Sequence, residues 1–77
     1  MTEEFKRQFD YNEKVCEASS LAMALGYEEG YYGNLMCENV DYCIRLRKAI
    51  RKLVGDKWPD LVLKRYSDAY HEGYMDS

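Results

Sequence analysis

The clearest pattern of apolar and polar positions lies between residues 39 and 54. At about 100° per residue, one side of this stretch is apolar and the opposite side is basic. Asn39 is a suitable N-cap, and Gly55 follows the last apolar residue, where helices commonly end. The pattern predicts an amphipathic helix over 39–54, and we expect the rest of the chain to pack around it. Its apolar side consists of Cys43, Leu46, Ile50, Leu53 and Val54.

Residues 3–25 have the same periodicity over a longer span. Thr2 is a suitable N-cap, and the polar side includes an acidic ridge of Asp10, Glu13 and Glu17. The pattern predicts a long helix that ends near Gly26, with its apolar arc facing the core. That arc contains Phe5, Phe9, Tyr11, Val15, Cys16, Ala18, Ala22 and Met23, with the small polar residues Asn12 and Ser19.

A third helix is predicted over 59–72. Trp58 is biased out of helix by the proline that follows, and Pro59 suits a first helical turn. Gly73 is the expected end, which leaves 74–77 as a short frayed tail. The apolar arc of this helix consists of Val62, Leu63, Tyr66, Ala69 and Tyr70.

The connection over 26–38 is rich in glycine and tyrosine. Its three glycines at positions 26, 30 and 33 favour a break in the first helix. The alternative is that this helix continues through Gly26–Tyr32, at a cost of about 1 kcal/mol for each glycine. Within the connection, a short fourth segment is expected near Leu35, just before the next helix.

These elements predict an all-α fold with a single domain over residues 1–77. The fold is a small bundle of three main helices, and the composition, 47% hydrophobic and 32% charged, is that of a globular chain. A core of this size gives a margin of only a few kcal/mol, so self-association is a common way for such domains to gain stability.

Charge is distributed unevenly along this acidic chain, whose net charge is −3. Residues 1–33 and 67–77 are acidic, whereas residues 34–66 carry eight of the eleven basic residues. Such a chain can neutralise itself on folding, pair head to tail between copies, or offer a partner two surfaces of opposite sign.

The cysteines and the N-terminal sequence indicate an intracellular, cytoplasmic protein in a reducing environment. Cys16, Cys37 and Cys43 are odd in number and form no C-x-x-C pair. No apolar run predicts a signal peptide or a membrane span. The spacing of Cys37 and Cys43 does not match a zinc framework, and we expect no metal and no cofactor.

Catalytic motifs are not evident in the sequence. His71 is the one histidine and lies on the predicted solvent side of the third helix. A pair formed by Cys37 and His71 is the alternative that would allow nucleophilic catalysis. The glycines at 26–33 lack the preceding strand that a dinucleotide site requires. We therefore expect a protein that is not an enzyme.

Two surfaces are candidates for binding a partner. One is a tyrosine patch, because tyrosine provides a large and rigid contact area at protein interfaces. The other is the basic face of helix 39–54, where Ile44 stands among the cations and Arg47 lies at the edge of the apolar arc. The residues concerned are Tyr27, Tyr31, Tyr32 and Met36 for the patch, and Ile44, Arg45, Lys48, Arg51 and Lys52 for the basic face.

The leading hypothesis is a small interaction protein that binds and modulates a protein partner. Its size and bipolar charge are typical of the compact inhibitors and regulators made by phages and other mobile elements. The tyrosine patch would occlude the partner, and the acidic ridge would meet a basic groove on it. One alternative is nucleic-acid binding through the basic face, and a second is a self-associating, homodimeric module.

Overall fold

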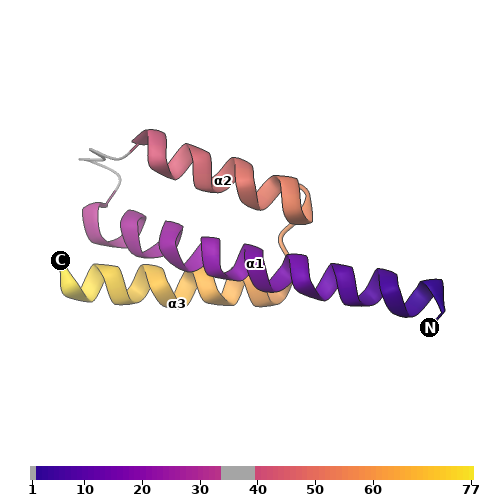
Figure 1. Cartoon of the computed structure of the whole chain (residues 1–77). Helices are drawn as coiled ribbons and strands as arrows, with labels where there is room; N and C mark the ends of the chain where they lie inside the picture. Colours follow the sequence, from indigo (N-terminus) through magenta and orange to yellow (C-terminus); the bar gives the residue numbers. More distant parts are fainter. Residues whose placement is uncertain (1, 34–39) are drawn as a thin grey trace.

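The computed structural model describes residues 2–33 and 40–77, which form three helices (Figure 1). The helices are α1 (Glu3–Tyr32), α2 (Val40–Val54) and α3 (Asp60–Asp76), and the described residues contain no strand. The predicted all-α fold with three main helices is confirmed. The predicted fourth segment near Leu35, the cap at Asn39, and the residues Met36 and Cys37 lie outside the described residues. No helix in the described part of the chain is long and apolar enough to cross a membrane.

Helix α1 lies between the other two helices (Figure 1). Helix α2 runs antiparallel to α1, and α3 runs parallel to it. Both approach α1 closely, whereas no Cα atom of α2 lies within 8 Å of a Cα atom of α3. The expectation that helix 39–54 is the structural axis is therefore wrong. The axis is α1, because its 30 residues offer α2 and α3 two separate packing sides.

Helix α1 continues through the glycines that predicted its end. A Cβ atom added to Gly26 would overlap the backbone oxygen of Tyr66, and one added to Gly30 would overlap that of Tyr70. The helix ends at Gly33, which has φ 66° and whose amide donates to the Glu29 carbonyl at 2.9 Å. The predicted break at Gly26 is wrong because Gly26 and Gly30 are positions of close helix packing.

Helix α3 likewise continues past Gly73, to Asp76. A Cβ atom at Gly73 would overlap the backbone oxygen of Tyr27, so this glycine also admits a neighbouring backbone. The predicted end at Gly73 is therefore wrong, and residues 74–76 belong to the helix instead of a frayed tail. The predicted start of this helix is correct to one residue, since Pro59 is the N-cap (φ −59°, ψ 157°) and the helix begins at Asp60.

The hydrophobic core lies where all three helices overlap. It confirms the predicted apolar side of α2, from which Cys43, Leu46 and Ile50 are buried. Helix α1 supplies mainly small side chains and one large one, Leu25, which is fully buried. The remaining core residues are Val15, Ala18, Ala22 and Val62.

The first turns of α1 extend beyond this core, contrary to the prediction from its apolar arc. Phe5 is 55% exposed and Phe9 59%, and Cys16 and Met23 are exposed as well. For Phe5 and Phe9 the reason is the register between the parallel helices, whereas Met23 lies level with α3 and its exposure has another cause. Gly26 meets Tyr66, Gly30 meets Tyr70 and Gly73 meets Tyr27, so the first residue of α3, Asp60, lies level with about residues 16–20 of α1. The first turns of α1 therefore extend beyond the start of α3 (Figure 1).

Candidate functional site

Three tyrosines form an aromatic cluster at the C-terminal end of α1. Tyr27 and Tyr31 stack with ring centroids 6.0 Å apart, and Tyr31 meets Tyr32 edge to face at 4.9 Å. Each side chain remains exposed, at 37%, 40% and 39% respectively. The predicted patch therefore exists as a set of touching rings, although it is built on a helix and not on a turn. Its predicted fourth member, Met36, lies outside the described residues.

The aromatic cluster is anchored to the end of α3. The Tyr27 hydroxyl donates to Oδ2 of Asp76 at 3.1 Å, and the Tyr27 backbone lies against Gly73. The hydrogen bond to the Asp76 carboxylate, reinforced by desolvation and by nearby negative charge, raises the pKa of Tyr27 above its usual 10.0. This contact thus favours the neutral phenol of Tyr27. The hydrogen bond to Asp76 also holds one ring of the cluster in place.

The predicted basic face of α2 is accessible. Arg45, Lys48, Arg51 and Lys52 are all exposed, and Ile44 among them is 44% exposed. The Arg51 side chain has an ion pair with Asp56, Nε to Oδ1 at 3.1 Å. Because both partners are largely solvated, this pair contributes little to stability. The face is a solvated positive surface with one apolar side chain in it.

The aromatic cluster and the basic face do not form one surface. Glu29 is the α1 residue that contacts Arg47 of α2. At about 100° per residue, Tyr27 and Tyr31 lie about 160° around α1 from Glu29. The stacked rings therefore point away from α2, and only Tyr32 lies towards that side.

The acidic ridge extends around α1 from the side of the stacked rings towards α2, because Asp10, Glu13 and Glu17 line a hollow together with Leu53 of α2. Asp10, Glu13 and Glu17 are exposed. On the helical wheel they fall within about 100° of Tyr27 and Tyr31. Between Glu17 and Tyr31 the helix rises about 21 Å. The outer face of α1 thus carries carboxylates along its first half and aromatic rings at its far end.

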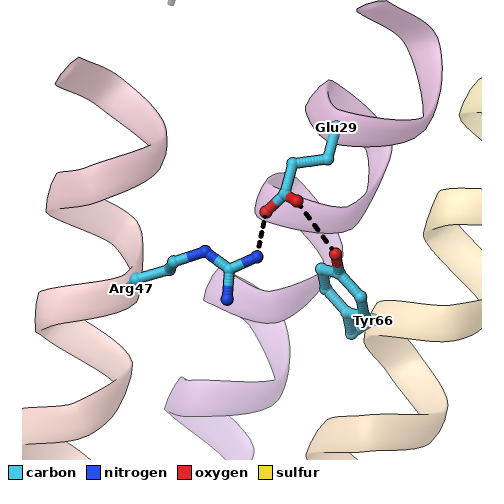
Figure 2. A network of polar contacts seen from close by, with 3 residues as sticks. All are labelled: Glu29, Arg47 and Tyr66. Carbon is cyan, nitrogen blue, oxygen red and sulfur yellow. Dashed lines mark hydrogen bonds and ion pairs between the residues drawn. The ribbon is translucent and has the colours of Figure 1, made fainter. Parts of the chain in front are cut away.

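A polar network that the sequence did not predict connects all three helices (Figure 2). Arg47 of α2 donates from Nη2 to Oε1 of Glu29 at 2.6 Å, and the Tyr66 hydroxyl of α3 donates to Oε2 of the same carboxylate at 3.0 Å. The Arg47 guanidinium carbon also lies 6.0 Å from the Trp58 ring centre and 5.9 Å from that of Tyr66. These contacts link α2 to α3, whose backbones do not meet.

The network places Tyr66 in a half-buried, negatively charged environment. Burial is the main cause that raises the pKa of Tyr66 above its usual 10.0, and the Glu29 carboxylate adds to it, while Arg47 opposes it. Glu29 accepts one bond from each neighbouring helix, so both carboxylate oxygens are engaged. This arrangement suits a structural clamp, because a catalytic carboxylate would need an oxygen directed at a substrate.

The cysteines and the histidine of the described part of the chain lie in different surroundings. His71 and Cys16 are exposed, and Cys43 is buried in the core. Within residues 2–33 and 40–77, no three His, Cys, Asp or Glu side chains come together as a metal site. The hypothetical pair of Cys37 and His71 cannot be placed, since Cys37 is outside those ranges.

Comparison with known proteins found no matching family model, no similar curated protein and no similar solved structure.

Proposed function

We propose that this protein is a non-catalytic interaction module that binds and modulates a protein partner through the outer face of α1. The observation that carries the proposal is the aromatic cluster of Tyr27, Tyr31 and Tyr32, three touching and exposed rings on the end of a packed helix. Rings held in this way lose little conformational freedom on binding, which favours affinity. Tyrosine is also enriched among the residues that dominate binding energy at interfaces.

The same face indicates the chemistry of the partner. The acidic ridge of Asp10, Glu13 and Glu17 lies farther along α1 than the rings, towards its N-terminus. It favours a partner with a basic surface, since complementary potentials speed association and align the two chains. A groove that binds nucleic-acid phosphates has that character. A small inhibitor or regulator that occupies such a groove, of the kind encoded by phages and other mobile elements, is the class that this proposal assigns. The reducing interior of a cell is the expected site of action.

The test compares capture of a partner by the wild type and by the Tyr31→Ala/Tyr32→Ala double variant. Proteins from the native host are captured on each immobilised chain, and the strongest specific partner is then purified and titrated calorimetrically. We expect the double variant to lose at least about tenfold in affinity, in the range of an interface hot spot. Its helical content, measured by circular dichroism, should stay the same because both rings are exposed.

Tyr11→Ala is the matched control for this experiment. Tyr11 is a 54% exposed tyrosine of the same helix, and it lies far from the aromatic cluster and on another side of α1. The control should bind as the wild type does. A double variant that captures the partner with unchanged affinity would eliminate the aromatic cluster as the contact surface.

A second candidate function, nucleic-acid binding, is favoured by the exposure of all four basic side chains around Ile44 on α2. Phosphate contacts of this kind make affinity fall steeply with salt. Labelled duplex DNA and RNA titrated at two salt concentrations would test it, with Arg45→Glu/Lys48→Glu as the variant. Absence of binding by the wild type at low salt would rule this function out.

A further inference from the structure

A stripe of residues along α1 has the spacing of a helix-packing seam. The alternating steps of four and three are those of a heptad repeat. In the C-terminal half of the seam, Met23 is 48% exposed, but Ser19 is buried, and Gly26 and Gly30 pack against the backbone of α3. In the N-terminal half, all members are exposed. The whole seam consists of Phe5, Phe9, Asn12, Cys16, Ser19, Met23, Gly26 and Gly30.

The N-terminal half of the seam is unoccupied because α3 begins too late in register to reach it. Asp60 lies level with about residues 16–20, so residues 3–16 of α1, about 21 Å of helix, extend past α3. A helix of this length is only marginally stable in water without packing. Yet its two phenylalanines, one turn apart, are 55% and 59% exposed. This half of the seam has the properties of an interface without its second helix.

We propose that the exposed half of the seam pairs with the same segment of a second copy of this chain, in antiparallel orientation. In this register Phe9 lies opposite Asn12 of the second copy, and Phe5 lies opposite Cys16 of the second copy. Each aromatic ring then faces a small side chain, so the distance between the two helices can be similar at both layers. The proposal goes beyond the function proposed above and rests on the seam, and the two surfaces share only Glu13.

Charge complementarity identifies the second helix as a copy of this one. Lys6 and Glu13 flank the seam at equivalent heptad positions. In the antiparallel register Lys6 lies opposite Glu13 of the second copy, and the twofold axis repeats the pair. Flanking pairs of this type set the choice and orientation of partners in coiled coils.

The antiparallel orientation also follows from the position of α3. A parallel copy would place Phe5 against Phe5, and would meet α3 where the seam becomes occupied, near Ser19. An antiparallel copy in this register pairs residues 5–16 of both chains, and its own α3 lies beyond the opposite end of the overlap. The paired segment therefore fits the free length of the seam.

Sedimentation velocity on the full chain, with reductant present to prevent disulfides through Cys16, tests the proposal. The wild type should form a dimer as its concentration rises from micromolar to about 1 mM. Lys6→Glu or Glu13→Lys alone should weaken the dimer by about tenfold or more, because each turns two attractive pairs into repulsive ones. An equimolar mixture of the two variants should restore the dimer, since every pair across the interface is then of opposite sign.

Arg7→Glu is the matched control. It makes the same change of charge in the same turn, but on the side of α1 opposite the seam, and the dimer should persist. The variant Phe5→Ala/Phe9→Ala should be monomeric with unchanged helical content at low concentration. A wild type that stays monomeric over the whole concentration range would overturn the proposal, and the exposed half of the seam would then require a partner other than a second copy. A dimer that neither charge variant weakens would overturn it equally.

Discussion

Gly30 of α1 and Tyr70 of α3 meet backbone against backbone, with no room for a side chain between them. The same relationship recurs one turn earlier, between Gly26 and Tyr66, and in the opposite direction between Gly73 and Tyr27. Small residues on both helices let their backbones approach, and the gain is close van der Waals packing over a long contact. Gly26, Gly30 and Gly73 therefore contribute to stability through the neighbouring backbone that each of them admits.

Replacing Gly30 or Gly73 by alanine is expected to destabilise the protein by about 2 kcal/mol, as overpacking does. The sign is diagnostic, because alanine in a helix interior is otherwise favoured over glycine by about 1 kcal/mol. Urea unfolding followed by circular dichroism measures the change. Ser20→Ala, at an exposed position of α1, should change stability by no more than about 0.5 kcal/mol. An increase in stability at Gly30 would show that α3 does not pack there.

Tyr66→Phe should lower the free energy of unfolding by about 1 kcal/mol, because it removes the hydrogen bond to a Glu29 carboxylate that is largely shielded from solvent. Tyr70→Phe is the matched control on the same helix, since the Tyr70 hydroxyl makes no hydrogen bond among the described residues, and little change is expected there. Equal effects of the two substitutions would contradict the network of Figure 2.

Stability should fall at alkaline pH more steeply in the wild type than in Tyr27→Phe/Tyr66→Phe. The folded chain raises the pKa of both hydroxyls above the unfolded value of 10.0. Their contribution is therefore fully present below pH 10 and is lost as pH rises through the folded pKa values. Unfolding free energies from about pH 9 to about pH 11.5 provide the measurement. Lysine titration affects both proteins alike, so parallel curves would contradict the proposed contribution.

Phe5→Ala and Phe9→Ala should each cost the monomer less than about 0.5 kcal/mol, because both rings are exposed. Leu25→Ala, at a fully buried position, should cost about 2–5 kcal/mol. The measurement requires thermal or urea unfolding at low protein concentration, where the chain is monomeric. A large loss at Phe5 or Phe9 under those conditions would place these rings in the core, as the apolar arc of the sequence predicts.

The sequence determines local structure better than it determines what covers each face. The bounds of α2 are predicted to within a residue at either end, because its periodicity and Gly55 agree. For α1 the same kind of apolar arc predicts that Phe5 and Phe9 lie in the core, but both are exposed. Amphipathicity identifies an apolar side, but the register of α3 decides how far along that side a neighbour reaches, and register is set by contacts distant in sequence.

The glycines explain the other errors. A glycine signals either a break or a close approach of another backbone, and only the position of the neighbouring helix distinguishes the two. Glu29 falls within 26–38, which the sequence predicts as a connection, so its place on α1 between Arg47 and Tyr66 is not predicted. The tyrosine patch is predicted from the three tyrosines of a glycine-rich segment, and the structure places them at the end of a helix and not in a turn.

The parallel packing of α1 and α3 has a consequence for how the chain acquires its structure. Gly26 and Tyr66 are forty positions apart, and this pairing brings together the first and third helices. During synthesis α1 and α2 are made before the helix that covers the glycines of α1. Contacts so distant in sequence close large loops and slow folding relative to bundles of sequential neighbours. The nascent chain is therefore expected to stay open to proteases and chaperones until α3 has been made.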